Sequence, residues 1–221
     1  MINLLLELRA DPSLKDGFMG SSPLMAGIPD RSDAQERSLK ILERLIDAGA
    51  DVNDITPAGI CALEFAVFQG NVACARMLLA RGADPQGNPK LLSPLQHAID
   101  QRDIEMVQVL LDNGAQVSGS GRRFRDGWTP LMWAAALDDV AIGRLLHQKD
   151  KDLLYYVAGK ERWTALHVAA VKGNHFFFKW VLEESKENGH FWDEVDFEGK
   201  TARDLATWEV NDRKRRRLGS S

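Results

Sequence analysis

The chain has 221 residues, of which 44% are hydrophobic and 27% are charged, and its formal net charge is -4. This composition is typical of a folded globular protein, and the acidic balance argues against nucleic acid as a partner, because nucleic-acid binding relies on a basic face. The sequence shows neither a secretory signal nor the roughly 18 consecutive apolar residues of a membrane span, and two cysteines are too few for a disulfide framework. We therefore expect a cytoplasmic protein without a membrane contact, with the nucleus as the alternative.

In chain order, the sequence divides into a short N-terminal element, five similar repeats and a shortened last repeat. The N-terminal element, 1–20, contains one apolar stretch at 4–12 that predicts a single capping helix. The five repeats span 21–54, 55–87, 88–124, 125–159 and 160–195, and the shortened repeat at 196–218 is followed by a tail at 219–221. Each full repeat carries a leucine two residues after a Ser, Thr or Cys, and these leucines lie at 24, 63, 95, 131 and 166. Their steps of 39, 32, 36 and 35 scatter around one repeat length of about 33 residues.

Each repeat contains the signals for a short helix, a turn and a second helix. Pro130 directly follows Thr129, which suits a first helical turn, because a proline N–H is not needed there and the threonine oxygen caps free amides. Gly70 and Gly173 end first helices, since glycine adopts the left-handed conformation easily. The second helices carry apolar residues at helical spacing and close on a glycine such as Gly114. No repeat could bury both apolar faces alone, so neighbouring repeats must stack.

The recurring phrase resembles the ankyrin repeat, whose hallmark is T-P-L-H-x-A. Residues 164–169, Thr-Ala-Leu-His-Val-Ala, match it closely, and residues 129–134 match it except at the histidine. The resemblance covers roughly residues 4–208 and implies an all-α solenoid of about five to six stacked helix-turn-helix units with hairpin tips, in a single domain over 1–218. It also implies that the chain binds another protein through its inner helices and tips, while the identity of that partner stays open.

Three stretches depart from the regular plan. The first repeat contains a polar insertion between Ile28 and Leu39, which we interpret as a lengthened turn between its two helices. Residues 116–128 carry several glycines and three arginines, and they predict a long, positively charged tip. Residues 148–163 lack the usual Gly-Ala-Asp stop and predict an irregular tip.

Apolar residues at the tips predict where a partner binds. The residue before the Ser, Thr or Cys slot is large and apolar in four repeats, at Ile60, Leu92, Trp128 and Trp163. Adjacent helices pack about 10 Å apart, so these side chains would form one stripe, and contiguous exposed apolar surface marks binding sites. Alternatively, each side chain stiffens its own hairpin, and the sequence leaves both interpretations open. The ends of the first helices would face the same concave side, and they add further predicted partner-binding residues: Phe68, Gln69, Asp100, Gln101, Leu137 and Lys172.

The residue pattern contains no recognisable catalytic or metal site. None of the five histidines pairs with another at the spacing that puts two ligands on one helical face, and neither a nucleophile motif nor a phosphate loop occurs. His167 occupies the histidine slot of the hallmark, where the resemblance implies that its imidazole bonds backbone groups. We interpret Cys61 and Cys74 as small buried residues rather than reactive thiols. The chain is accordingly expected to be a monomeric, non-enzymatic protein that needs no cofactor and takes no small-molecule substrate.

Two segments allow two interpretations each. Residues 175–180 hold four aromatics on one helix, and Phe176 is expected to point outward, either as a second contact patch or covered by residues 187–195. The basic run 213–217 is either a nuclear-import address or a polar cap on the last helix, and we favour the cap. The predicted function is an adaptor or inhibitor. A bacterial effector or toxin-neutralising protein and a nuclear regulator are the alternatives, and an enzyme hidden in an irregular tip is the weakest hypothesis.

Overall fold

The computed structural model of the chain describes residues 10–17, 19–30, 35–89, 91–117, 127–158, 160–185 and 194–206. These residues form helices without a named strand, and the chain separates into two compact units, unit 1 (1–116) and unit 2 (117–221). Isolated antiparallel bridges close hairpin tips and join Ile55 to Cys61, Ala158 to Trp163, and Val195 to Thr201. The repeated, all-α architecture expected from the sequence is confirmed, whereas the single-domain boundaries stay a prediction.

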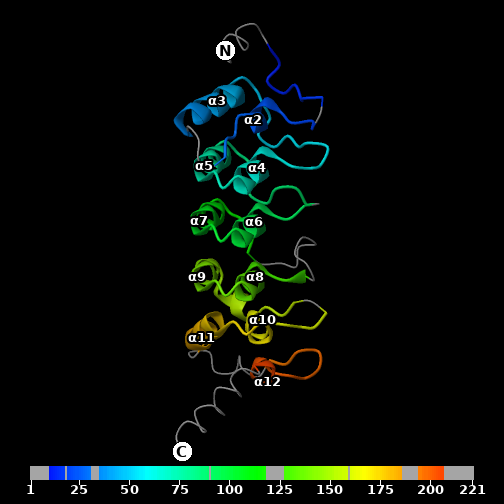
Figure 1. Ribbon diagram of the computed structural model, residues 1–221, viewed down its shortest axis with the longest axis vertical. Coiled ribbons are helices and arrows are strands. Elements are labelled where there is room, and N and C mark those ends of the chain that lie inside the picture. The colour runs from blue at the N-terminus through cyan, green and yellow to red at the C-terminus, as the bar shows by residue number, and fades with distance from the viewer. Residues whose placement is uncertain are drawn as a thin grey trace, which may run out of the picture. The chain divides into compact units, whose positions relative to one another are not determined.

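Unit 1 consists of two layers of short helices (Figure 1). Its helices are α2 (Pro23–Ala26), α3 (Gln35–Asp47), α4 (Ala62–Phe68), α5 (Val72–Ala80), α6 (Pro94–Asp100) and α7 (Ile104–Asp112). We call α2, α4 and α6 the inner layer, because the hairpin tips extend from their side, and α3, α5 and α7 the outer layer. Contacts run between neighbours within each layer, and α4 and α6 also pack on α5 and α7.

Unit 2 repeats the same plan. Its helices are α8 (Pro130–Ala136), α9 (Val140–Lys149), the 3-10 helix η2 (Lys151–Tyr155), α10 (Ala165–Lys172), α11 (His175–Glu184) and α12 (Ala202–Leu205). Helices α8, α10 and α12 form its inner layer, and α9 and α11 its outer layer (Figure 1). The irregular tip predicted for the fourth repeat contains η2, which packs on α9 and α10 and buries Leu153 and Leu154.

In the second to fifth repeats the first helix begins at the Ser, Thr or Cys slot, whose side chain caps it, whereas Ser22 of the first repeat makes no such cap bond. Oγ1 of Thr129 accepts the N–H of Met132 at 3.3 Å, and Oγ of Ser93 accepts the N–H of Gln96 at 3.2 Å. Proline follows both caps at the first helical position, where no N–H is needed. The leucines of the recurring phrase, at 24, 63, 95, 131 and 166, are all at most 2% exposed and form the core. The sequence phrase thus sets both the helix start and the buried face.

The second helix of a repeat begins at an Asn or Asp, and two of these residues also tie repeats together. Oδ1 of Asn71 accepts the N–H of Cys74 at 3.0 Å, while its Nδ2 donates to the carbonyl of Pro29 at 3.1 Å. Nδ2 of Asn174 donates to the carbonyls of Ala135 and Ala136 at 2.7 and 3.0 Å. Each amide therefore links a second helix to the preceding repeat of its own unit.

The residue before this second cap takes the left-handed conformation in four repeats. Gly70 and Gly173 have φ of 66° and 73°, as expected from the sequence. Arg102 and Asp138 occupy the same slot with φ of 54° and 58°. A residue with a Cβ pays about 1 kcal/mol or more for this conformation, so these two repeats store local strain that glycine avoids.

The aromatic run of the fifth repeat is mostly core. Phe177 and Trp180 are buried against α9, where a Cβ on Gly143 would lie 2.6 Å from the Phe177 ring and 2.7 Å from the Trp180 ring. Only a glycine allows this approach. Phe176 is 74% exposed, which confirms that it points outward, whereas the segment expected to cover it lies largely outside the described residues.

Several sequence predictions fall on residues that the structure does not describe. These are the N-terminal helix up to residue 9, residues 31–34 of the first insertion, the arginine-rich part of the 116–128 tip and the basic run at 213–217. The end of the first insertion, from Gln35, belongs to α3, so the turn predicted there is shorter than expected. In the part of the chain that is described, no helix has the length and apolar character that crossing a bilayer takes.

Candidate protein-binding surface

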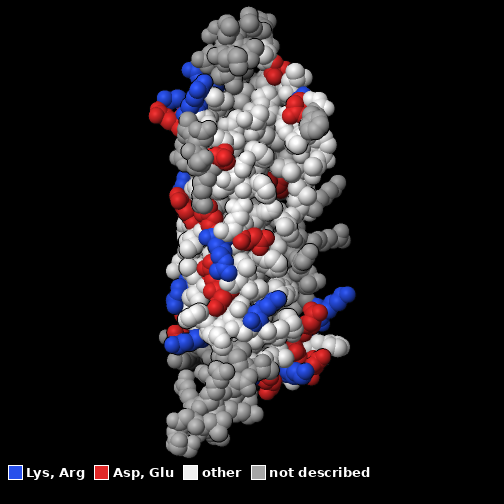
Figure 2. Space-filling model, viewed as in Figure 1, with Lys and Arg blue, Asp and Glu red and all other residues white. Residues whose placement is uncertain are grey.

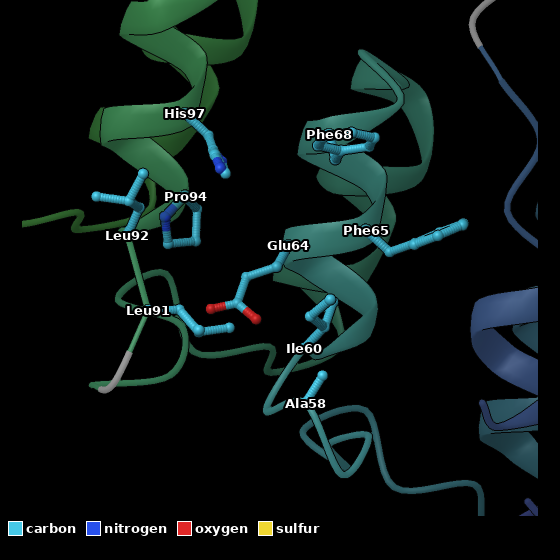
Figure 3. A pocket seen from close by; sticks show the side chains of 9 residues that line it. All are labelled: Ala58, Ile60, Glu64, Phe65, Phe68, Leu91, Leu92, Pro94 and His97. Carbon is cyan, nitrogen blue, oxygen red and sulfur yellow. The ribbon is translucent and has the colours of Figure 1, made fainter. Parts of the chain in front are cut away.

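An apolar hollow opens in unit 1 between the inner helices α4 and α6 (Figure 3). It has a volume of about 490 Å³, and we call it the α4–α6 hollow. Its lining comes from two consecutive tips and the helices behind them: Ala58, Ile60, Glu64, Phe65, Phe68, Leu91, Leu92, Pro94 and His97. Three residues predicted from the sequence to bind a partner, Ile60, Phe68 and Leu92, therefore lie around one hollow.

Large apolar side chains stay exposed at the mouth of this hollow. Phe68 is 64% exposed and Leu92 is 37% exposed. The Phe68 and His97 rings contact each other, with centroids 6.2 Å apart and planes tilted by 55°, so they bound the hollow at the C-terminal part of the helices. Nε2 of Gln101 donates to the carbonyl of Phe68 at 3.1 Å and ties the ends of α4 and α6 together. These contacts keep the Phe68 side chain at the surface and outside the core.

Glu64 fixes the hairpin at the other end of the hollow. Its Oε2 accepts the N–H of Cys61 at 2.9 Å, and its Oε1 accepts the N–H of Asn88 in the next tip at 2.8 Å. Nδ2 of Asn88 in turn donates to the carbonyl of Gly59 at 2.7 Å. In Figure 3 the Glu64 carboxylate points from α4 toward Leu91. The tip that carries Leu91 is thus held in place by the helix that forms the opposite wall.

A second hollow of about 550 Å³ lies on the other side of α4, and we call it the α2–α4 hollow. Its lining is Asp16, Gly17, Met19, Gly20, Ser21, Met25, Thr56, Pro57, Ala58, Ile60 and Phe65. Ala58, Ile60 and Phe65 line both hollows, so the two are direct neighbours. Figure 3 shows the Phe65 side chain pointing away from α6, toward this second hollow. Met19 is 65% exposed, so this hollow also keeps a large apolar side chain at its surface.

Three tryptophans form a row in unit 2. The ring of Trp128 lies 5.8 Å from that of Trp133 and 6.5 Å from that of Trp163, centroid to centroid, and all three side chains are half-buried. Trp163 also lines a hollow of about 390 Å³ with Phe197, which is 78% exposed. The two predicted anchors therefore contact each other across consecutive tips. They support their hairpins and still present aromatic surface.

The other predicted residues lie at the ends of the inner helices. Asp100, Gln101 and Lys172 are exposed, and Gln69 and Leu137 are half-buried. In each unit they share the inner layer with the residues described above. The stripe predicted from Ile60 to Trp163 runs through both units, and its continuity stays a prediction.

Charges of unit 1 lie over the outer layer and also on the tip side (Figure 2). Arg81 on the α5 side lies 2.6 Å from Asp47 and 3.4 Å from Glu43 of α3, and Arg76 lies 3.3 Å from Glu105 of α7. Most of the surface over α4 and α6 that Figure 2 shows carries neither sign of charge. The ion pairs of the outer helices thus lie away from the α4–α6 hollow, whereas Lys15 and Asp54 pair at 2.8 Å in the tips beside the α2–α4 hollow.

The thiols and the buried imidazole have structural roles. Cys61 and Cys74 are 5% and 0% exposed, and burial raises the pKa of each thiol to about 11. Their interpretation as small buried residues is confirmed. Nδ1 of His167 accepts the N–H of Thr164 at 3.2 Å, its Nε2 lies 3.3 Å from the carbonyl of Lys200, and burial lowers its pKa. The described residues contain no group of three His, Cys, Asp or Glu side chains that could hold a metal ion.

The sequence prediction missed several residues of the hollows. Phe65 and His97 occupy the variable position after the fourth residue of the recurring phrase, as Trp133 does in unit 2. This position faces the inner side in all three repeats, and its unusually large side chains were a usable signal. Met19 and Leu91 lie in tips without regular periodicity, so only the folded hairpin reveals them.

The comparisons with known proteins agree with this geometry. A family model described as ankyrin repeats in three copies matches residues 32–119, 87–155 and 118–191. The chain belongs to the ankyrin-repeat family. Ankyrin repeat domain-containing protein 13B of Homo sapiens is 40% identical over 72 residues, which cover 32% of this chain and 12% of that protein. Glycerophosphocholine phosphodiesterase gde1 of Schizosaccharomyces pombe is 32% identical over 136 residues, which cover 61% of this chain and 11% of that protein.

The chain spans about a tenth of the length of these curated relatives. Among solved structures, the ankyrin repeat domain of human ASB11 is similar with a TM-score of 0.70 and 24% identity, covering 92% of this chain and 85% of that one. The ankyrin repeat domain of Bcl-3 gives a TM-score of 0.74 and 21% identity, covering 93% and 89%. At these identities the likeness shows the fold alone, and it confirms the ankyrin solenoid.

Proposed function

We propose that this chain is a non-enzymatic adaptor or inhibitor that holds another protein against its inner helices and hairpin tips. Ankyrin repeats are protein-interaction modules. The observation that carries the proposal is the exposure of Met19, Phe68 and Leu92 around two neighbouring hollows, while the leucines of the repeat frame are buried. A monomeric protein of the cytoplasm is the form in which we propose that it acts.

Exposed apolar groups of this size are unfavourable in water unless something covers them. Fully burying a Leu or Phe side chain is worth about 1.5 to 3 kcal/mol, and the repeat frame does not need these side chains for its own core. Contiguous apolar surface on a soluble protein usually marks an interaction site. A partner that covers the hollows would gain this free energy on binding.

The tryptophan row of unit 2 supplies the second part of the proposed surface. Trp128 and Trp163 are half-buried and hold each other at 6.5 Å between ring centroids, so little side-chain freedom remains to be lost on binding. Tryptophan is a preferred interface hot spot, and truncating one at an interface centre costs about 2 kcal/mol or more. These two residues are the anchors that we expect a partner to contact in unit 2.

The proposal is tested by affinity capture from the cell of origin with the full chain immobilised. We expect a specific protein that is retained by the wild type and is lost with Phe68→Ala/Leu92→Ala or with Trp128→Ala/Trp163→Ala. The control is Ile104→Ala, which removes a 46% exposed side chain from the outer helix α7. Circular dichroism melts establish that each variant is folded. A partner retained equally by all variants, or lost only with Ile104→Ala, would contradict the proposal.

Two alternatives share this experiment. A toxin-neutralising or effector role would use the same surface, and it is distinguished from adaptor function by whether the captured protein loses its own activity on binding. A nuclear regulator would depend on residues 213–217, which lie outside the described residues. A fluorescent fusion that enters the nucleus only when this run is intact would support that role, and one that stays cytoplasmic in both forms would remove it.

A further inference from the structure

The geometry points to a particular partner segment for unit 1: an extended, polyproline-II-like stretch with two bulky apolar side chains three residues apart and a Lys or Arg beside them. Each apolar side chain enters one hollow. This inference rests on the proposed function and names the kind of segment that the same surface takes.

The spacing of the two hollows sets the spacing in the partner. The hollows lie on either side of a shared wall made by Ala58, Ile60 and Phe65, and they belong to consecutive inner helices. Packed helices lie about 8 to 10 Å apart, so equivalent points in the two hollows repeat at about that distance. A polyproline II segment rises about 3.1 Å per residue with three residues per turn, which returns a side chain to the same face every 9 Å or so. A β-strand returns its side chains to one face at about 7 or 13 Å, which fits less well.

The shape and chemistry of the walls favour the same segment. Phe68 and His97 give the α4–α6 hollow aromatic walls, Phe65 points toward the α2–α4 hollow, and the exposed Phe68 and Met19 stand at the mouths of the two hollows. Grooves lined by aromatic side chains suit polyproline II segments, which are already extended and lose little conformational entropy on binding. The hollows therefore supply the binding free energy through apolar contact, and the preformed segment lowers its entropic cost.

The charged residues that line the hollows are acidic, and the neighbouring Lys15 is paired with Asp54 at 2.8 Å. Glu64 lines the α4–α6 hollow and Asp16 lines the α2–α4 hollow, and no lysine or arginine among the described residues lines either one. Backbone N–H groups of Cys61 and Asn88 hold the Glu64 carboxylate in its place at the wall of the hollow. A basic residue next to the apolar anchors is complementary to this arrangement, and an acidic one is repelled.

The test uses fluorescence anisotropy with labelled synthetic peptides and the full chain. The probe carries two leucines three residues apart, a proline before each, one lysine beside the second leucine and neutral flanks. We expect saturable binding with a Kd of about 100 μM or tighter. One control peptide places the leucines two residues apart, and another replaces the lysine by glutamate. Each control is expected to bind at least tenfold more weakly.

Matched protein variants locate the binding. Met19→Glu and Phe68→Glu each place a charge at one hollow, and each is expected to weaken the probe at least tenfold. Leu14→Glu is the control, because Leu14 is 70% exposed in the same unit and lines neither hollow. All three side chains are exposed, so the substitutions leave the core intact, which thermal melts verify.

Three outcomes would overturn the inference. They are no binding of the probe, equal binding of both leucine spacings, and tighter binding of a helical peptide with leucines seven residues apart, which also spans about 10 Å. If a protein is still captured in a manner that depends on Phe68, the proposed function stands while the segment is wrong. Probe binding without any captured protein would leave the chemistry of the hollows established and remove the proposed function.

Discussion

In the second and fifth repeats, different residues join the start of the first helix to the next hairpin tip. We call each of these arrangements a corner. In the second repeat, Glu64 accepts the N–H of Cys61 with one oxygen and the N–H of Asn88 in the next tip with the other. In the fifth repeat, His167 accepts the N–H of Thr164 with Nδ1, which leaves the proton on Nε2 to face the carbonyl of Lys200 in the next tip at 3.3 Å. Each side chain caps its own helix and also holds the following hairpin.

The two corners show that a carboxylate and an imidazole are interchangeable here, because each has two polar atoms that reach in opposite directions. The repeat itself does not require them, since Met132 takes this position in the fourth repeat and is fully buried. The surroundings differ, because His167 is 1% exposed whereas Glu64 is half-buried at the edge of the α4–α6 hollow. The His167 side chain in unit 2 is therefore enclosed, whereas the Glu64 side chain in unit 1 also lines the hollow of the proposed binding surface.

Of the changes that compare the two corners, replacing His167 should have the largest effect on the free energy of unfolding. We expect His167→Ala to lower the free energy of unfolding by about 3 kcal/mol, because it leaves a cavity and unpairs the Thr164 N–H and the Lys200 carbonyl in a dry corner. Urea denaturation followed by tryptophan fluorescence measures this change. His167→Gln, which keeps polar atoms in place, is the control and should recover part of the loss. A loss below about 1 kcal/mol for the alanine variant would show that the imidazole contacts contribute little.

Replacing Glu64 should cost less, because water reaches its corner. We expect Glu64→Ala to lower the free energy of unfolding by about 2 kcal/mol, as the N–H groups of Cys61 and Asn88 lose charge-assisted acceptors. Hydrogen exchange at the Asn88 amide should accelerate more than exchange at Thr164, since the hairpin of unit 1 is the part released. Glu64→Gln keeps one acceptor oxygen, so its free energy of unfolding should fall between those of the wild type and Glu64→Ala. Equal acceleration at both amides would mean that the corner does not act locally.

The sequence could predict these corners and the frame around them. The hallmark phrase puts a cap and a buried leucine at fixed offsets, and both are local requirements of helix geometry, whereas the fourth residue is polar only in some of the repeats. Cys61 and Thr164 cap their helices as the phrase predicts, and His167 bonds backbone groups as the resemblance implies. The double role of Glu64 is less visible, because the next tip approaches it only after the repeats have stacked.

The residues that line the two hollows were predicted only in part. Ile60, Phe68 and Leu92 could be found by aligning repeats, because each sits at a fixed offset from a leucine of the frame. Met19 and Leu91 could not, since their positions depend on hairpins that are fixed by tertiary hydrogen bonds such as that from Asn88 to Glu64. Local periodicity carries no information about such contacts.

Acidification should change the free energy of unfolding less than the two substitutions do, and it should act on the His167 corner. Burial lowers the pKa of His167 below its ordinary value of 6.5, so the unfolded chain takes up this proton at a higher pH than the folded chain. The contribution of His167 is therefore complete above about pH 7 and is lost as pH falls through 6.5 toward the lowered pKa, by at most about 1.4 kcal/mol per pH unit. Urea titrations between pH 7.5 and 5 on the wild type and on His167→Gln measure it.

The wild type should lose more stability than His167→Gln over this range, and parallel curves would contradict the assignment. A separate loss of stability on acidification belongs to Asp196 in the last tip and to Asp204 in α12. Backbone N–H groups, with Lys200 first, lower the pKa of Asp196, and the Thr201 hydroxyl lowers that of Asp204. Their contribution is present above their ordinary pKa of 3.8 and disappears only as pH falls below it, so it does not overlap the histidine range.

The smallest expected effect comes from making the two caps alike. Sγ of Cys61 accepts the N–H of Glu64 at 3.5 Å, and sulfur is a weak acceptor, whereas Thr164 caps the fifth repeat with a hydroxyl. The thiol is neutral at neutral pH because burial raises its pKa to about 11, so no charge is lost on substitution. We expect Cys61→Thr to raise the free energy of unfolding by about 0.5 to 1 kcal/mol, the usual worth of a better cap. Cys61→Ser offers the hydroxyl without the extra methyl group, and a gain from threonine but none from serine would assign the effect to packing instead of capping.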